Sequence, residues 1–387
     1  MISYPVSIVA LLNNCVSRIM IYIMRGKDKK ALLTTYLISV FLLFISGLLL
    51  TAARRFPGFA PWYAATVYPF CVGIFGRISG LLHFSLSEIL CAAIPMILIA
   101  DLIVCISGSL KRESRASGGL LRFITHIILL VSVLLFLYSA NCGINYYRDP
   151  FIDPQEYTDT VFSTDELSDF CEYTVLRLRE CYDLSGDTSV YPDGAELADA
   201  AVRSMHHLGE EHPGLKGFYP RPKQLTFMSS LFSGMGVSGI YSPFTIEANV
   251  NGEMTGLEKP FTSCHELSHL RGYMNEGEAN YIGWLACIGS DDPAFRRSGW
   301  LISWIYAGGS LRRSDPDLYE SIYRKLPDAA VEELTANSKF WAEHETGASE
   351  VQNRVNDAYL KSNGQPGGIQ TYGTLTTLML LWQRNMQ

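Results

Sequence analysis

The sequence has few charged residues and no sustained basic run, and both features limit the classes of function that it can have. Charged residues make up 18% of the 387 positions, and the formal net charge is -7. A nucleic-acid-binding surface needs clustered lysine and arginine, often interleaved with aromatic residues, and no stretch of the sequence has this pattern. We therefore expect no nucleic-acid partner.

The nine cysteines also lack a paired spacing, because no C-x-x-C occurs. This absence argues against a zinc knuckle and against a thioredoxin-type redox pair. Internal repeats and low-complexity stretches are missing as well. What the sequence does have is apolar residues, at 48% of positions. That content is high for a wholly soluble protein with so few charges.

The apolar excess lies before residue 141, in three runs at about 31–52, 89–110 and 120–140. Each run is close to the roughly 20 residues that a helix needs to span a bilayer. Basic residues flank the runs at two places, before the first run and between the second and third: Arg25, Lys27, Lys29 and Lys30, then Lys111, Arg112, Arg115 and Arg122. Because basic flanks mark the cytoplasmic side, three spans place the rest of the chain outside.

These runs predict a multi-pass protein of the plasma membrane. Residues 1–30 form a cytoplasmic leader, residues 31–140 a membrane domain, and residues 141–387 an extracytoplasmic domain long enough to bury its own core. The segment 56–84 alternates aromatic residues with proline and glycine, which is typical of an interfacial piece.

Two ionisable residues interrupt the second and third runs. Asp101 and His126 lie at similar depth when counted from the basic loop between the runs. An isolated charge facing lipid is costly, so we expect these two side chains to pair. We interpret the pair as a polar contact that holds two helices together, with a proton-relay role as the alternative.

The extracytoplasmic part contains one motif with a defined chemistry, H-E-x-x-H, at His265, Glu266 and His269. Residues four apart share a helix face, so both imidazoles can reach one zinc ion. Zinc lowers the pKa of a bound water, and Glu266 beside the first ligand can take the proton as general base. Pro260 and Gly272 supply a helix start and stop. The motif predicts peptide hydrolysis.

Catalytic zinc keeps three protein ligands and one open position, so a third ligand should follow. Glu276 and Glu278 both come shortly after Gly272, and either could return to the metal. We favour Glu276, in which case Glu278 would be free to form a salt bridge with Arg271. Asn280 lies one turn after Glu276, on the same face, where it could orient a ligand imidazole from the second shell.

Two regions around the motif are candidates for substrate contacts. Residues 239–250 mix aromatic and β-branched side chains, which predicts an edge strand able to pair with an extended substrate. Tyr359 and Tyr372 lie in a carboxy-terminal region that is rich in glycine, and either hydroxyl could stabilise an oxyanion. Ordinary core packing is the alternative for both tyrosines.

The motif and the residues after it resemble the gluzincin pattern, in which the third ligand is a glutamate on a later helix. The interval between His269 and Glu276 is shorter than in thermolysin-like members. The H-E-x-x-H-x-x-G portion also resembles metzincins, but Asn275 stands where those proteins carry a third histidine.

Over roughly residues 57–381, the chain resembles bacterial membrane proteins grouped as domain-of-unknown-function family 3810 (DUF3810). Blocks at residues 62–69, 243–250, 276–281 and 356–365 carry this resemblance, together with the His265 motif. The resemblance implies a three-span anchor and a zincin-like domain, and it implies no substrate.

The expected fold is therefore an α+β zincin-like catalytic domain that follows a three-span transmembrane α-helical anchor. Within the domain we expect helices near 165–182 and 193–209, a small sheet around 222–251, and paired helices over 260–289. The expected function is a membrane-anchored zinc metallopeptidase with one Zn²⁺, a peptide or protein substrate on the outer face, and the lipid bilayer as partner. The alternative is a non-catalytic receptor or scaffold that binds a peptide or ligand. Glu266 favours the enzyme, because a pure zinc-binding module needs no general base.

Overall fold

The computed structural model describes residues 27–111, 116–158, 160–185, 190–365, 368 and 374–386. Within these residues, three helices are long and apolar enough to cross a membrane: α2 (Lys27–Arg55), α6 (Leu86–Lys111) and α7 (Ala116–Tyr138). They coincide with the three predicted spans, which are confirmed as helices of spanning length. Most of the predicted leader, residues 1–30, lies outside the described residues.

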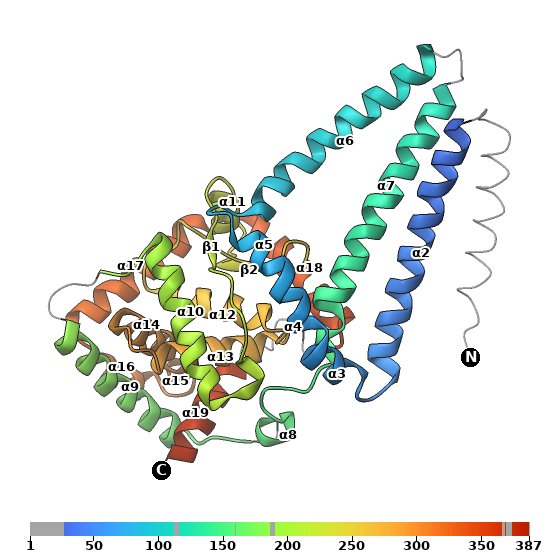
Figure 1. The fold of residues 1–387 in the computed structure, drawn as a ribbon. Helices are drawn as coiled ribbons and strands as arrows, with labels where there is room; N and C mark the ends of the chain where they lie inside the picture. Colours follow the sequence, from blue (N-terminus) through green and yellow to red (C-terminus); the bar gives the residue numbers. More distant parts are fainter. Residues whose placement is uncertain are drawn as a thin grey trace. The chain divides into compact units, whose positions relative to one another are not determined.

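The chain divides into two compact units. The first contains residues 1–51 and 89–140, and so holds most of the three long helices. In this unit, α6 and α7 draw together where α6 ends and α7 begins (Figure 1). His126 Nδ1 lies 2.9 Å from Asp101 Oδ2, so the predicted pairing of these residues is confirmed.

The second unit contains residues 52–88 and 141–387. Its first stretch is the segment predicted to be interfacial, and it folds into short helices: α3 (Phe59–Thr66), α4 (Tyr68–Cys71), a π-helical turn (Val72–Gly76) and α5 (Arg77–Gly80). Tyr68 anchors this segment. Its hydroxyl lies 2.9 Å from the Tyr241 hydroxyl and donates to the Leu270 carbonyl at 3.0 Å. Because Leu270 ends helix α12 (Glu258–Leu270), the segment is fixed to the helix that carries the H-E-x-x-H motif.

Two buried carboxylates fix the end of the same segment. Glu247 accepts the backbone N–H of Ser87 at 2.9 Å and forms a buried ion pair with Lys223. Glu88 accepts the backbone N–H of Met228 at 2.7 Å. A buried carboxylate needs partners for its oxygens: Glu247 has both an ion pair and hydrogen bonds, and Glu88 has hydrogen bonds from Thr226 and Met228. Residues 85–88 are therefore an integral part of the second unit.

The outer face of this segment keeps large apolar side chains in contact with solvent. They include Phe56, Trp62, Phe70, Phe75, Ile78 and Leu81, all more than half exposed. Exposed apolar side chains in this number are more typical of a segment that contacts protein or membrane than of ordinary protein surface.

The described residues form one small sheet with the strand order β1-β3-β2. β1 (Lys223–Gln224) is parallel to β3 (Glu247–Val250), and β2 (Gly239–Ser242) is antiparallel to β3, with Gly239 opposite Val250. The predicted strand over 239–250 is thus a pair of strands, in which β2 is the edge and β3 the centre. The α+β class overstates the sheet, because the described structure is mostly helical.

Helix α12 lies at the centre of the second unit, and every residue from Pro260 to Leu270 is buried. Pro260 falls in the first turn of α12, where backbone N–H groups have no partner within the helix, so proline costs no hydrogen bond there. The other helices are α8 (Pro154–Tyr157), α9 (Thr164–Ser185), α10 (Gly194–Glu211), α11 (Ser229–Gly234), α13 (Glu276–Ile288), α14 (Pro293–Ser303), α15 (Gly309–Ser314), α16 (Pro316–Tyr323), α17 (Asp328–His344), α18 (Gly347–Ser362) and α19 (Thr374–Met386). The predicted helices near 165–182, 193–209 and 260–289 match α9, α10 and the pair α12–α13.

Candidate metal centre

The two histidines of the motif face the same way on α12. His265 and His269 are four residues apart, and their ring centroids lie 4.7 Å from each other with the ring planes at 88°. Only 9% and 8% of their respective surfaces are exposed. Adjacent imidazoles on a buried helix face are the arrangement that the H-E-x-x-H spacing predicts.

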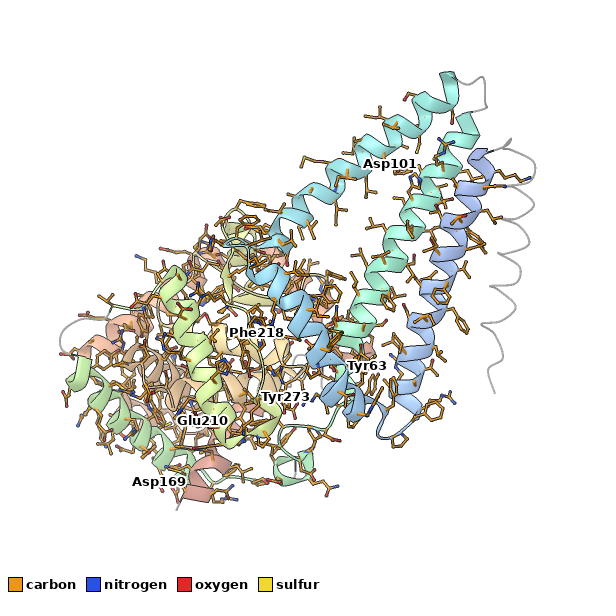
Figure 2. All side chains as sticks on the ribbon, viewed as in Figure 1. Tyr63, Asp101, Asp169, Glu210, Phe218 and Tyr273 are labelled. Carbon is orange, nitrogen blue, oxygen red and sulfur yellow. The ribbon has the colours of Figure 1, made fainter. Side chains whose placement is uncertain are left out.

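A tight turn brings the next helix back over these imidazoles. Gly272 has φ of +89°, a left-handed conformation that favours glycine, and Tyr273 N–H donates to the Ser268 carbonyl at 3.1 Å. This six-to-one hydrogen bond is typical of a helix terminated by glycine. Figure 2 labels Tyr273 in this turn. The Asn275 side chain then caps α13 by accepting the N–H of Glu278 at 3.2 Å. Glu276 therefore starts α13 immediately after the reversal.

The crossing of α12 and α13 is unusually close at one glycine. A Cβ atom on Gly283 would lie 3.0 Å from the backbone nitrogen of His265 and 3.2 Å from its Cα. Such distances leave almost no space for a side chain between the helices. The contact fixes α13 against the first histidine and so helps to place Glu276.

The structure brings His265, His269 and Glu276 together. Glu276 Oε2 lies 3.4 Å from His265 Nε2 and 3.5 Å from His269 Nε2. The three donor atoms all lie within 4.8 Å of one another. Zinc bonds of about 2.0–2.2 Å in tetrahedral geometry separate neighbouring ligand atoms by roughly 3.3–3.5 Å. The two measured separations fit this spacing, so these residues could hold a zinc ion without large rearrangement.

The Glu276 carboxylate favours a positive charge on His269, whereas burial disfavours one on His265. Burial alone would lower the pKa of His269, but the carboxylates of Glu276 and Glu266 raise it to about 9. Burial would raise the pKa of Glu276, but His269 and His265 hold it well below the usual range of a glutamate. Burial lowers the pKa of His265, and this effect outweighs the opposing influence of Glu276. A buried site that holds an ionised carboxylate suits a divalent cation.

The second ring nitrogens of the two imidazoles have different surroundings. His269 Nδ1 lies 2.7 Å from the carbonyl of Tyr273, so Nδ1 carries a proton, and Nε2 is the ring nitrogen that would lose its proton to bind a metal. Metal-binding histidines usually donate a hydrogen bond from the N–H of their second ring nitrogen in this way. Asn280 is buried one turn after Glu276 and acts to raise the pKa of His265, but the Nδ1 atom of His265 has no hydrogen-bond partner among the described residues. Of the two imidazoles, His269 is the one whose second ring nitrogen is fixed by a hydrogen bond.

Glu266 lies deep beside the ligands. It is 3% exposed, and its Oε2 has no hydrogen-bond partner among the described residues. Its other oxygen is directed at the start of β2, where a Cβ on Gly239 would come within 2.6 Å of it. Burial raises the pKa of Glu266 to about 8, although His269 opposes the shift. The carboxylate is therefore positioned between the candidate ligands and the edge strand.

The remaining predicted residues lie elsewhere. Glu278 accepts the backbone N–H of Phe151 at 2.6 Å, and burial raises its pKa to about 7. The predicted salt bridge between Glu278 and Arg271 is wrong in the described structure, since Arg271 instead donates to the Lys216 carbonyl. Glu278 is two residues, about half a turn, after Glu276, so it points to a different face of α13.

Of the two predicted tyrosines, Tyr359 is described by the structure and does not join the ligand cluster. The Tyr359 hydroxyl on α18 accepts from Tyr146 at 3.2 Å and lies 3.5 Å from Cys142 Sγ. Tyr372 lies outside the described residues. Tyr306, which the sequence analysis did not single out, interacts electrostatically with the cluster: burial and the charges of Glu258 and Glu276 raise its pKa to about 12. Tyr306 lies in a π-helical turn, Trp304–Gly308, a local geometry that often occurs at functional sites. No spacing pattern in the sequence marks it.

The fold and this cluster define a class: a mostly helical protein with three helices of bilayer-spanning length and a buried His–His–Glu centre with a second glutamate beside it. The chain belongs to the family described as "Protein of unknown function (DUF3810)", whose model matches residues 63–380. The expected family membership is confirmed. No curated protein and no solved structure matches the chain.

Proposed function

We propose that this protein is a membrane-anchored zinc metallopeptidase of zincin type, in which His265, His269 and Glu276 hold one Zn²⁺ and Glu266 is the general base. The observation that carries this proposal is the set of separations at the cluster, 3.4 and 3.5 Å from Glu276 Oε2 to the two imidazole nitrogens. Hydrogen bonding alone would favour shorter distances, whereas a shared metal ion favours these.

The chemistry follows from the position of Glu266. A zinc ion bound at the cluster would lower the pKa of a water in its open position. Glu266 follows His265 directly in the sequence, and its Oε2 has no other hydrogen-bond partner among the described residues. It can therefore take the proton of that water and later give it to the leaving amine of a cleaved peptide bond.

The edge strand supports a peptide as substrate. β2 pairs with β3 on one side, and no strand covers its other edge within the described residues. Ile240 on this strand is 46% exposed. An extended peptide that added to β2 would pass beside Gly239, and so beside the Glu266 carboxylate. This placement would bring a scissile bond to the general base.

The proposed location is the outer face of the plasma membrane. The spanning helices are compatible with a lipid bilayer, and the basic residues flanking them would lie in the cytoplasm by the positive-inside rule. The exposed apolar face of residues 56–84 would then contact the outer interface of the bilayer. Substrates would be extracytoplasmic peptides or proteins close to the membrane.

The decisive experiment compares the full chain in detergent with its Glu266→Gln variant on a mixed peptide library, with cleavage read by mass spectrometry. We expect the variant to keep its zinc and lose about 10²–10⁴-fold in rate, the range for a missing general base. His265→Ala should lose both zinc and activity. Glu210→Gln, which changes an exposed carboxylate on α10, is the matched control. Equal cleavage by wild type and Glu266→Gln would refute the mechanism, and zinc binding without cleavage by either would favour the receptor or scaffold.

A further inference from the structure

A second group of side chains that could hold a metal ion belongs to the first unit, whereas the H-E-x-x-H motif belongs to the second. Asp101 and Cys105 are four residues apart on α6, and His126 comes from α7. Cys105 Sγ lies 3.6 Å from Asp101 Oδ1, and His126 Nδ1 lies 2.9 Å from Asp101 Oδ2. One donor atom from each of the three residues lies within 4.8 Å of the other two. Figure 2 labels Asp101 on α6.

A close helix crossing holds this group together. A Cβ on Gly119 of α7 would lie 2.4 Å from the carbonyl oxygen of Cys105 and 2.7 Å from Ser109 Oγ. Only glycine allows the two backbones to approach so closely, a common device where helices pack within membranes. His126 follows Gly119 by seven residues, two helical turns, and so lies on the same face of α7. The crossing therefore directs donors from both helices to one point.

Helices α6 and α7 are long and apolar enough to span a bilayer, so ionisable residues within them need an explanation. Ionisable side chains within spanning helices are rare because they are costly to place there, and they usually mark a functional site. A contact that merely joined two helices would need Asp101 and His126 alone. Cys105 adds a thiol at the same point, and carboxylate, thiolate and imidazole are the three ligand types that zinc takes from proteins. An aspartate, a thiolate and a neutral histidine around a divalent ion also carry no net charge, which suits a bilayer.

We propose that Asp101, Cys105 and His126 form a second metal site, of the zinc class, between α6 and α7. The separation between Cys105 Sγ and Asp101 Oδ1 matches the roughly 3.5 Å expected for a thiolate and a carboxylate oxygen on one tetrahedral zinc. His126 contacts the other carboxylate oxygen, Oδ2, at 2.9 Å, so the ion would be shared between both oxygens of Asp101, and the contact with His126 would open by a few tenths of an ångström. Three protein ligands leave a fourth position open, so the ion is exchangeable.

Cobalt absorption spectroscopy tests this site, because a thiolate ligand gives a charge-transfer band that imidazole and carboxylate ligands do not. The full chain in detergent, carrying His265→Ala and His269→Ala to remove the first centre, is titrated with Co²⁺. We expect a thiolate-to-cobalt band that saturates at one ion per chain and is reversed by Zn²⁺. In the same background, Cys105→Ser should abolish the band. Cys91→Ser, which changes an exposed cysteine on the same helix, should leave it intact.

Asp101→Asn separates the metal site from a purely hydrogen-bonded contact. The amide oxygen can still accept from His126, so the helix pair should keep its helical circular dichroism and its thermal unfolding temperature. A metal site should lose at least about tenfold in cobalt affinity, as happens when groups that support a bound metal are removed. The proposal is overturned if no thiolate band forms, if the band survives Cys105→Ser, or if Asp101→Asn binds cobalt as tightly as its parent. None of these results depends on peptidase activity.

Discussion

Gly283→Ala measures how strongly the crossing of α12 and α13 controls the candidate zinc ligands. The new Cβ would lie 3.0 Å from the backbone nitrogen of His265 and 3.2 Å from its Cα. Both are backbone atoms in the buried part of α12, so they cannot move aside as the end of a flexible side chain could. Helix α13, which carries Glu276, must instead shift by a few tenths of an ångström. Zinc sites tolerate departures of only about 0.2 Å in ligand distance.

Two opposing terms set the effect on stability. Overpacking a tight contact costs about 1–3 kcal/mol. Alanine is favoured over glycine inside a helix by about 0.8–1.0 kcal/mol. We therefore expect a net loss of up to about 2 kcal/mol in the free energy of unfolding. For zinc, we expect affinity to fall about 10–100-fold, the range seen when a group that positions a metal ligand is removed.

The assay is competition for zinc against a chromogenic chelator, together with thermal unfolding with and without zinc. Gly347→Ala is the matched control, because Gly347 also lies in a helix of the second unit but has no atom within 4 Å of the new Cβ. The control should bind zinc like the wild type. If Gly283→Ala were more stable than the wild type by about 1 kcal/mol, as propensity alone predicts, and bound zinc equally well, the crossing would not control the site.

Two further substitutions test other parts of the second unit. Glu276→Gln should weaken zinc binding by more than about 100-fold, which is more than the loss typical of a group that only supports a ligand. Glu278→Gln should bind zinc normally, because Glu278 accepts the Phe151 N–H instead. Equal losses of zinc affinity in the two variants would refute Glu276 as the third ligand. Glu247→Gln should cost about 3–5 kcal/mol near neutral pH, since it leaves the buried Lys223 unpaired. Burial alone would raise the pKa of Glu247, but Lys223 and Ser87 lower it. The ionised Glu247 therefore contributes fully to the free energy of unfolding above the usual glutamate pKa of about 4.3, and this contribution is lost as pH falls through the lowered pKa. Denaturant unfolding across this range should show the gap between wild type and variant narrowing in acid, and a gap independent of pH would contradict the pairing.

The features that sequence predicted well depend on local pattern. Three apolar runs of sufficient length can form only spanning or deeply buried helices, and all three appear as predicted. Histidines at positions i and i+4 share a helix face whatever the surroundings, so the pairing of His265 and His269 followed from their spacing. The contact between Asp101 and His126 followed from depth along two antiparallel runs.

The features that sequence missed depend on contacts between distant residues. The sheet was overestimated because strands of two to four residues carry almost no periodic pattern. Glu276 and Glu278 are both in the first turn of α13, and only the direction set by Gly272 and the Asn275 cap separates them. No sequence pattern near Gly283 or His265 predicts their close approach.

The anchoring of residues 52–88 by Tyr68 and Glu247 has a consequence for how the protein matures. The unit that carries the candidate centre is assembled from two pieces of chain, and the residues between them include the second and third long helices. Ribosomal synthesis delivers the first piece well before the second. If those helices cross the bilayer as proposed, the unit cannot close until both crossings are complete, so insertion itself becomes the step that precedes a functional fold. A fragment starting at residue 141 would lack the Tyr68 hydroxyl that meets Leu270 at the end of α12, and should not reproduce the behaviour of the whole chain.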